Sequence, residues 1–282
     1  MSDTLATALR AAVARLAGAG LPDAPRDARA LVAAAAGLPP DRLTIEAGSP
    51  WTAQMQAALD LSLARRIARE PVTRILGHRL FWGRRFAVTP DVLDPRPDTE
   101  TVIAAALEGG TARRVLDLGT GSGILALTLL AEWPGATALA TDVSPAALAV
   151  AQGNADALGL GDRVSFLHSD WFAAVAGRFD MIVSNPPYVS EAEMAGLDPE
   201  VALHDPRQAL TPGGDGLDPY RVIAAQAAAH LQPGGRLLVE IGWRQGPAVA
   251  ALFQGAGLEA IAVHPDMEGR DRCIAARRSE TG

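Results

Sequence analysis

Cysteine and lysine are the scarce residues of this sequence. Among 282 residues there is one cysteine, Cys273, and all 25 basic residues are arginine. A single thiol excludes a disulfide framework and a cysteine zinc site, and the apolar run around it predicts a buried, inert side chain. No apolar run is long enough to span a bilayer, and the first residues lack the layout of a signal peptide. We therefore expect a cytoplasmic protein with no membrane attachment.

The net charge of −7 is unevenly divided along the chain. Residues 1–90 contain 12 arginines against 7 acidic residues, a net of +5, and residues 91–282 have a net of −12. Seven arginines fall between Arg65 and Arg85. This arginine run has two interpretations: a solvated helix face, or a surface that contacts RNA or an RNA-bound partner.

The first 72 residues have apolar side chains spaced by three and four, which predicts a small bundle of helices near 5–17, 27–36 and 52–69. The bundle contains no cluster of catalytic residue types, so we expect a recognition or docking role. After Pro71 the pattern alternates, which predicts a β-hairpin linker over residues 73–92. Residues 93–282 then form the main domain.

Apolar strands alternate with helices through the main domain, which predicts an α/β fold with a mostly parallel, doubly wound sheet. The last two strands, near 258–264 and 271–276, are joined by a short link and should form an antiparallel hairpin. A long polar segment over 190–215 is typical of a lid or binding loop.

A glycine-rich turn follows the strand at 114–118 and leads into a helix over 124–132. Glycines there let the backbone approach a ligand and present N–H groups at a helix start. The spacing Gly-x-Gly-x-Gly differs from the Gly-x-Gly-x-x-Gly of dinucleotide binders. Asp142 ends the next strand, about 20 residues further on, where an acid can hold both ribose hydroxyls. It can also cap the helix that begins at Pro145, and the two roles are compatible.

A third strand ends before Asp170 and Trp171, which could accept from an adenine amine and pack against its ring. Between the hairpin and the glycine-rich turn, Asp98 or Thr99 can cap the following helix. A cap alone does not require the neighbouring Arg96 and Glu100, so the same turn is also a candidate to line a site.

A fourth strand, 179–183, ends in Asn185-Pro186-Pro187-Tyr188. The prolines hold an extended loop at the carboxyl end of this strand, where open α/β sheets bind ligands. The side-chain carbonyl of Asn185 and the main-chain carbonyl of Pro186 could accept both N–H groups of a planar NH2, and Tyr188 offers a flat face. The alternative is a plain proline-rich turn.

The glycine-rich turn, the acids that end the next two strands and the Asn-Pro-Pro-Tyr loop follow one another in this order. Together they resemble the motifs of the class I S-adenosylmethionine-dependent methyltransferases, which have a Rossmann-like sheet. The Asn-Pro-Pro-Tyr sequence is similar to that of enzymes that methylate an NH2 on adenine, guanine or the glutamine amide. Further motifs resemble the peptide-chain release factor glutamine methyltransferase family. These are Pro71-Val72-x-x-Ile75-Leu76-Gly77, Phe81-Trp82-Gly83, Pro95-Arg96-Pro97-Asp98-Thr99-Glu100, Leu116-Asp117-Leu118-Gly119, Ser169-Asp170-Trp171-Phe172 and Glu240-Ile241-Gly242. Asp94 departs from the apolar residue expected there.

The resemblance implies methyl transfer from S-adenosylmethionine to the side-chain N5 of the glutamine in the Gly-Gly-Gln motif of class-one release factors, leaving S-adenosylhomocysteine. It implies a role in translation termination and no metal. The implied donor-binding residues are Gly119, Thr120, Gly121, Ser122, Gly123, Asp142, Asp170, Trp171, Asn185, Arg96 and Glu100. The implied catalytic residues are Asn185, Pro186, Pro187 and Tyr188.

No histidine or lysine lies in these motifs, so we expect in-line transfer without a general base, the proton leaving to solvent. The main competing interpretation is a methyltransferase of adenine or guanine in nucleic acid. The acidic main domain weighs against it and the arginine run in its favour. A binding module that retains only the fold is a second alternative. We expect a monomer, with the arginine run allowing proximity to the ribosome.

Overall fold

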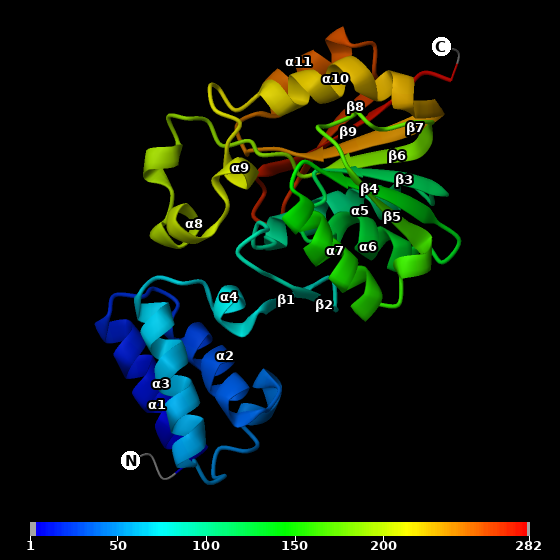
Figure 1. The fold of residues 1–282 in the computed structure, drawn as a ribbon. Coiled ribbons are helices and arrows are strands. Elements are labelled where there is room, and N and C mark those ends of the chain that lie inside the picture. The colour runs from blue at the N-terminus through cyan, green and yellow to red at the C-terminus, as the bar shows by residue number, and fades with distance from the viewer. Residues whose placement is uncertain (1–3, 281–282) are drawn as a thin grey trace. The chain divides into compact units, whose positions relative to one another are not determined.

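The computed structural model describes residues 4–280, which form two compact units. The first unit contains the residues up to His78 together with Asp198–His204. The second contains Arg79–Leu197 and the residues from Asp205 onward. Figure 1 shows a helical first unit and a second unit built on a sheet.

The first unit is the predicted helical bundle. Its helices are α1 (Leu5–Gly18), α2 (Ala24–Ala36), η1 (Pro40–Leu43), α3 (Ala53–Ile67), α4 (Val72–Leu76) and α8 (Pro199–His204). Thr4 and Thr52 cap α1 and α3, because their hydroxyls accept from the N–H groups of Thr7 and Met55. Leucines on the inner helix faces form a closed apolar core.

The hairpin prediction is wrong at its start. Residues Val72–Leu76 form helix α4, and only β1 (His78–Phe81) and β2 (Arg84–Ala87) pair as a hairpin. Val72, Ile75 and Leu76 have the i, i+3, i+4 spacing of a helix face and pack against the bundle core. Gly77, at a φ of 73°, ends the helix in the left-handed conformation.

The second unit contains the predicted doubly wound sheet. Its seven strands lie in the order β5-β4-β3-β6-β7-β9-β8, with only β9 antiparallel to its two neighbours. They are β3 (Arg114–Leu118), β4 (Thr137–Asp142), β5 (Val164–His168), β6 (Phe179–Ser184), β7 (Leu231–Glu240), β8 (Glu259–Pro265) and β9 (Asp271–Arg277). The strand order reverses between β3 and β6, so their carboxyl ends form the crevice where such sheets bind ligands.

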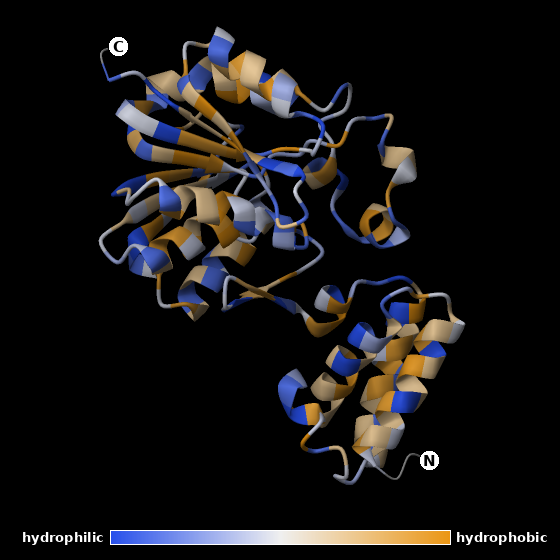
Figure 2. Cartoon of the chain, turned by 180° about the vertical axis from the view of Figure 1, so that it is seen from behind, coloured by the Kyte–Doolittle hydropathy of each residue, from blue (hydrophilic) through white to orange (hydrophobic). Residues whose placement is uncertain are grey.

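Helices cover both faces of the sheet. On one face lie α5 (Glu100–Glu108), α6 (Ile124–Glu132) and α7 (Pro145–Ala157), and on the other α10 (Asp218–His230) and α11 (Gly246–Gly255). Successive side chains of a strand point to opposite faces, so Val115 packs in the first layer and Leu116 in the second. The central strands β3, β6 and β7 are therefore mostly apolar on both sides, and Figure 2 shows much of the sheet in orange. Short 3-10 turns are η2 (Pro97–Thr99) and η3 (Gly161–Arg163).

The polar segment after β6 contains three short helices, η4 (Met194–Gly196), α8 and α9 (Arg207–Leu210). Helix α8 belongs to the first unit, where Glu200 Oε1 lies 3.1 Å from Arg66 Nη1 and 3.5 Å from Arg69 Nη1. Arg66 also pairs with Asp27 at 2.7 Å. Two acids therefore surround one buried arginine. Between residues 4 and 280, no helix has the length and apolar character needed to cross a membrane.

Candidate active site

A cavity of about 350 Å³ opens at the carboxyl ends of β3, β4 and β6 in the second unit. Its size is within the range of ligand pockets. The predicted site residues that line it are Gly119, Thr120, Gly121, Ser122, Asp142, Asp170, Trp171, Asn185 and Pro187. The structure thus brings together residues that are up to 68 positions apart in the sequence. Gly123, Pro186, Tyr188, Arg96 and Glu100 are not part of its lining.

The glycine-rich turn has the backbone that its composition predicts. Gly119, Gly121 and Gly123 have φ values of 68°, 56° and 84°, a region that favours glycine. The Thr120 N–H donates to the Thr141 carbonyl at 2.8 Å, which attaches the turn to the adjoining strand. Gly123 precedes the first residue of α6 and lies between two residues that line the cavity, Ser122 and Ile124.

Asp117 supports this turn from inside β3, a role that its place in the sequence did not predict. Its Oδ2 accepts from the Thr120 hydroxyl at 2.6 Å and from the Ala126 N–H at 3.2 Å. Its Oδ1 is buried with no hydrogen-bond partner among residues 4–280. Burial raises the pKa of Asp117 to about 7, against the hydrogen bonds that lower it. An acid within an otherwise apolar strand was the signal available in the sequence.

Asp142 joins the turn to the next helix. Its Oδ2 accepts from the Gly121 N–H at 2.9 Å, and its Oδ1 accepts from the Ser144 N–H at 2.9 Å. The side chain that caps α7 is Ser144, whose Oγ accepts from the Ala147 N–H at 3.2 Å, so the capping alternative for Asp142 is wrong. The carboxylate instead lies at the cavity wall.

Asp170 and Trp171 lie in a tight turn after β5. Ser169 fixes this turn by donating its hydroxyl to the Trp171 carbonyl at 2.9 Å and by accepting from the Ala174 N–H at 3.0 Å. Trp171 has a φ of 48°, an uncommon value for a tryptophan. The turn presents both side chains to the cavity.

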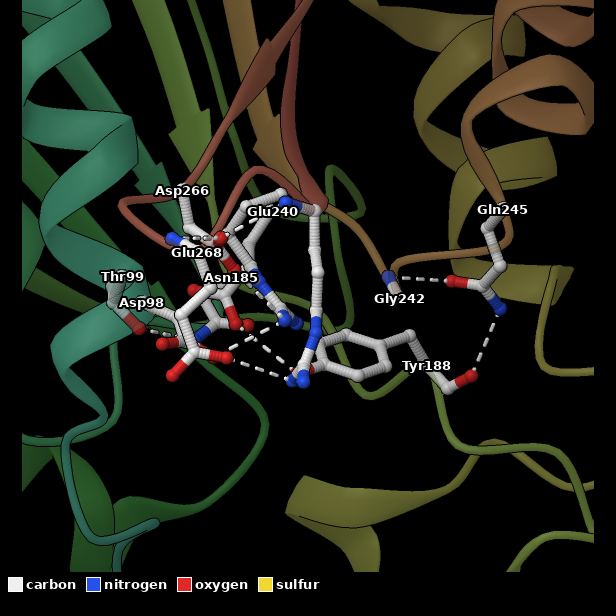
Figure 3. A network of polar contacts seen from close by, with 11 residues as sticks. Asp98, Thr99, Asn185, Tyr188, Glu240, Gly242, Gln245, Asp266 and Glu268 are labelled. Atoms are coloured by element: carbon white, nitrogen blue, oxygen red, sulfur yellow. Dashed lines mark hydrogen bonds and ion pairs between the residues drawn. The ribbon is translucent and has the colours of Figure 1, made fainter.

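The Asn-Pro-Pro-Tyr loop is held at two points (Figure 3). Asn185 Nδ2 donates to Thr99 Oγ1 at 3.2 Å, and the Tyr188 carbonyl accepts from Gln245 Nε2 at 3.0 Å. Gln245 is itself fixed, since its Oε1 accepts from the Gly242 N–H at 2.9 Å. A loop held in this way presents Asn185 and Pro187 to the cavity in one conformation.

Tyr188 does not lie with its ring in the cavity lining. Its hydroxyl donates to Glu240 Oε1 at 3.2 Å, at the end of β7. Burial raises the pKa of Tyr188 well above its usual value, and the Glu240 charge adds to this rise. The sequence predicted no role for Glu240 and only a helix cap for Thr99. The signal at Glu240 was again an acid that ends an apolar strand.

The turn before α5 differs from its prediction. Thr99 has helical backbone angles and makes no capping bond, because its hydroxyl accepts from Asn185 instead. Arg96 pairs with the buried Asp205 at 2.6 Å, and Glu100 accepts from the Trp82 N–H at 3.0 Å. Both side chains are therefore bound to neighbouring residues, and neither lines the cavity. Of the Pro95–Glu100 turn, Pro95 lines the cavity.

Two further residues have structural roles. Asp94, which departs from the apolar residue expected at its position, is buried and pairs with Arg79 at 3.3 Å. Cys273 is buried, as predicted, and burial raises the pKa of its thiol well above the usual value. In the part of the chain that the structure describes, no group of three or more His, Cys, Asp or Glu side chains is placed to hold a metal ion.

Two protein-family models match the chain. Residues 7–77 match the PrmC N-terminal domain, and residues 96–217 match the methyltransferase small domain. A release factor glutamine methyltransferase of Cereibacter sphaeroides is 58% identical over 272 residues, which cover 96% of this chain and 98% of that protein. One of Rhodospirillum rubrum is 50% identical, over 95% of this chain and 83% of that protein.

Solved structures share the fold at low identity. The hMettl16 catalytic domain, in complex with the MAT2A 3′UTR hairpin 6, gives a TM-score of 0.58 at 18% identity and covers 78% of this chain and 82% of that one. A methyltransferase from Pyrococcus furiosus gives 0.54 at 18% identity, over 77% of this chain and 97% of that one. At this level the likeness establishes the methyltransferase architecture alone.

Proposed function

Because the chain belongs to the release factor glutamine methyltransferase family, we propose that it methylates a glutamine side chain of a class-one release factor. The methyl donor is S-adenosylmethionine, the acceptor is N5 of the glutamine in Gly-Gly-Gln, and S-adenosylhomocysteine is released. The observation that carries this proposal is the single cavity lined by both the glycine-rich turn and Asn185. The residues that would bind the donor and the residue that would bind the acceptor therefore line the same cavity.

The cavity residues fit the proposed donor. The backbone of Gly119–Ser122 would hold the methionine end, Asp142 the ribose hydroxyls, and Asp170 with Trp171 the adenine. Asp117 supports the turn from behind, because its carboxyl accepts from the Thr120 hydroxyl and the Ala126 N–H. Bound there, the sulfonium supplies the methyl electrophile. Gly123, Arg96 and Glu100 would act as supports of the wall rather than as direct contacts.

Asn185 and Pro186 fit the proposed acceptor. Asn185 commits its Nδ2 to Thr99, so its Oδ1 remains as an acceptor for an N–H of the substrate amide. The Pro186 carbonyl, held rigid by Pro187, would take the second N–H. Two acceptors out of the amide plane favour a pyramidal nitrogen with a directed lone pair, which is preorganisation without a general base. The proton then leaves to solvent after transfer.

The arginine run gives little support to binding of nucleic acid. Among the ion pairs described, several neutralise arginines of this run: Arg65 with Glu70, Arg66 with Asp27 and Glu200, Arg69 with Glu200, Arg79 with Asp94, and Arg84 with Glu132. Neutralised arginines contribute less to phosphate binding. We propose that the bundle instead docks the release factor, that the enzyme acts as a monomer, and that any ribosome contact is secondary.

The test is transfer of labelled methyl from S-adenosylmethionine to a purified release factor. Matched reactions use the same factor with the Gly-Gly-Gln glutamine changed to asparagine, and bulk DNA and rRNA. Label in the unchanged factor alone is the expected result. Label in nucleic acid and none in the factor would move the acceptor to a base amine and overturn the proposal. If the protein neither binds S-adenosylmethionine nor transfers a methyl group, the proposal is wrong and the chain is a binding module that retains only the fold.

A further inference from the structure

One wall of the cavity comes from the long polar segment after β6, whose length and polarity are typical of a lid or binding loop. We call residues 205–214 the cover segment. It contains α9, which Figure 1 shows beside the ends of the strands. Four of its residues line the cavity: Gln208, Ala209, Thr211 and Pro212. The contacts at the two ends of this segment decide whether that wall is fixed.

The cover segment begins at a buried ion pair. The Asp205 side chain is 0% exposed, and its Oδ2 accepts from Arg96 Nη2 at 2.6 Å. Its Oδ1 accepts from the backbone N–H of Asp94 at 3.2 Å. Pro95, which lies between these two partners in the sequence, lines the cavity. The first residue of the cover segment is therefore attached to the cavity wall on both sides of Pro95.

The other end of the cover segment is attached to the Asn-Pro-Pro-Tyr loop. The Leu210 carbonyl accepts from the Val189 N–H at 2.9 Å, and the Gly214 carbonyl accepts from the Glu191 N–H at 3.0 Å. Val189 directly follows the loop, of which Pro187 lines the cavity. The cover segment therefore spans the cavity from the turn before α5 to the Asn-Pro-Pro-Tyr loop.

The two attachments are of different kinds. The second consists of backbone hydrogen bonds, whereas the first depends on the charge of one side chain. A buried carboxylate is stable only when it is paired, and its hydrogen bond to a guanidinium is stronger than one between neutral groups. Arg96 is 32% exposed, so water can reach the pair from the arginine side. The Asp205–Arg96 pair is therefore the attachment that can break while the backbone bonds remain.

We propose that Asp205 is a positioning residue, which pairs with Arg96 to keep the cover segment closed over the bound methyl donor. This inference rests on the proposed function and adds to it the group that retains S-adenosylmethionine in the cavity. When the pair breaks, the segment can swing on its backbone bonds to the Asn-Pro-Pro-Tyr loop, and the donor or S-adenosylhomocysteine can leave. Closure of such a segment excludes water and commits the bound substrate to the reaction.

The first test compares two ion pairs of the same segment. Asp205→Asn keeps the size of the side chain and removes the charge of the buried pair. Glu191→Gln does the same to the pair of Glu191 with Arg207, whose side chains are more than half exposed, and is the matched control because exposed pairs contribute little. The full-length proteins are measured for Tm and, by stopped-flow tryptophan fluorescence, for kon and koff of S-adenosylhomocysteine.

We expect Asp205→Asn to raise koff about 10-fold, the effect of losing one hydrogen bond between charged groups. It should not lower kon, because most effects of altered binding contacts are on dissociation. Glu191→Gln should keep the wild-type rates. A variant that damages the donor-binding residues themselves would instead lower kon or abolish binding.

Arg96 provides the second half of the test, and it carries the test if Asp205→Asn does not fold. Arg96→Gln should raise koff as much as Asp205→Asn. The double variant should raise it no further, because each single variant already removes the same pair. Arg96 contacts Asp205 through one nitrogen, which an ammonium can replace, so Arg96→Lys should recover most of the wild-type retention.

Hydrogen exchange separates positioning from a structural role. In Asp205→Asn the backbone of the cover segment should exchange faster than in the wild type, while β3 and β6 keep their wild-type exchange. Saturating S-adenosylhomocysteine should slow exchange of the segment in the wild type more than in the variant. Faster exchange throughout the second unit would show that the pair only stabilises the fold, and would overturn the proposal.

The proposal is also overturned if Asp205→Asn and Arg96→Gln both keep the wild-type koff, or if Glu191→Gln raises koff equally. Methylation of the release factor by the wild type in the same series upholds the proposed function in either case. If the wild type binds the donor and methylates nucleic acid, the proposed function is wrong and the same rates still decide the role of Asp205. If it binds no donor, both proposals are wrong.

Discussion

The Asp142 carboxylate accepts the backbone N–H of Gly121 at 2.9 Å, so the glycine-rich turn and the end of β4 are tied together at the cavity wall. Asp142→Asn replaces one acceptor oxygen with a donor, which then faces either the Gly121 or the Ser144 N–H. A hydrogen bond to a charged group contributes about 1.5–3 kcal/mol, so we expect the Kd for S-adenosylmethionine to rise about 10- to 100-fold. Isothermal titration calorimetry measures this change. Asp162→Asn, at an exposed position in η3, is the control and should bind as the wild type does.

Asp117 should make stability depend on pH. Its pKa is raised to about 7 in the folded protein, from an ordinary value of 3.8, so between these values the folded state holds a proton that the unfolded state has lost. The free energy of unfolding therefore falls as pH rises from about 4 to 7, by up to about 4 kcal/mol from this group.

Asp117→Asn should remove that part of the slope and retain the acceptor for Thr120 and Ala126. Urea unfolding of the ligand-free protein at a series of pH values measures the effect. An unchanged slope in Asp117→Asn would show that this carboxyl is already ionised at low pH in the fold.

Gly123 should tolerate alanine poorly. Its φ of 84° is strained for any side chain, and an added Cβ would lie 2.9 Å from Leu127 Cδ1 and 3.3 Å from the Ala151 Cβ. Gly159, with a φ of 67° and open space around it, is the matched control. Strain alone costs about 1–2 kcal/mol, and crowding adds about 1–3 kcal/mol. Urea unfolding should therefore show Gly123→Ala to be clearly less stable than Gly159→Ala; equal losses would mean that α6 shifts freely.

The buried ion pair of the bundle should matter more than an exposed one. Asp27 and Arg66 lie 2.7 Å apart with side chains 12% and 8% exposed, whereas Asp60 and Arg15 form a pair that is nearly half exposed. Asp27→Asn should cost roughly 2 kcal/mol, because Arg66 keeps Glu200 as a partner. Asp60→Asn should cost less than about 1 kcal/mol. Thermal unfolding of both variants followed by circular dichroism provides the comparison, and similar Tm values would contradict it.

The sequence was most informative where local rules and fold agree. Strands that are apolar on both faces, the glycine spacing and the prolines after β6 each require a particular backbone, and the structure has that backbone at the expected residues. The same rules failed at Val72–Leu76, because a segment of five residues can fit both strand alternation and helical spacing. This segment is helical because it packs against the core of the bundle.

Thr99 and Glu240 show what the sequence could not predict. They lie 141 positions apart in the sequence. Thr99 bonds Asn185 and Glu240 bonds Tyr188 only because η2 and β7 end near the same loop. Thr99 fits a helix cap equally well, and local sequence contains no information on which partner its hydroxyl takes. Tyr188 is similar, because its hydroxyl partner on β7 is set by strand order rather than by the loop sequence.

The assignment of α8 to the first unit has a consequence for dissecting the chain. The polypeptide passes between the two units three times, so no single cut separates them. A fragment that stops after His78 would leave Arg66 and Arg69 without Glu200, and a matching deletion in the larger fragment would open the connection between the Asn-Pro-Pro-Tyr loop and α9. Fragments meant to isolate the bundle should therefore carry Asp198–His204 on a linker, in the manner of a circular permutation.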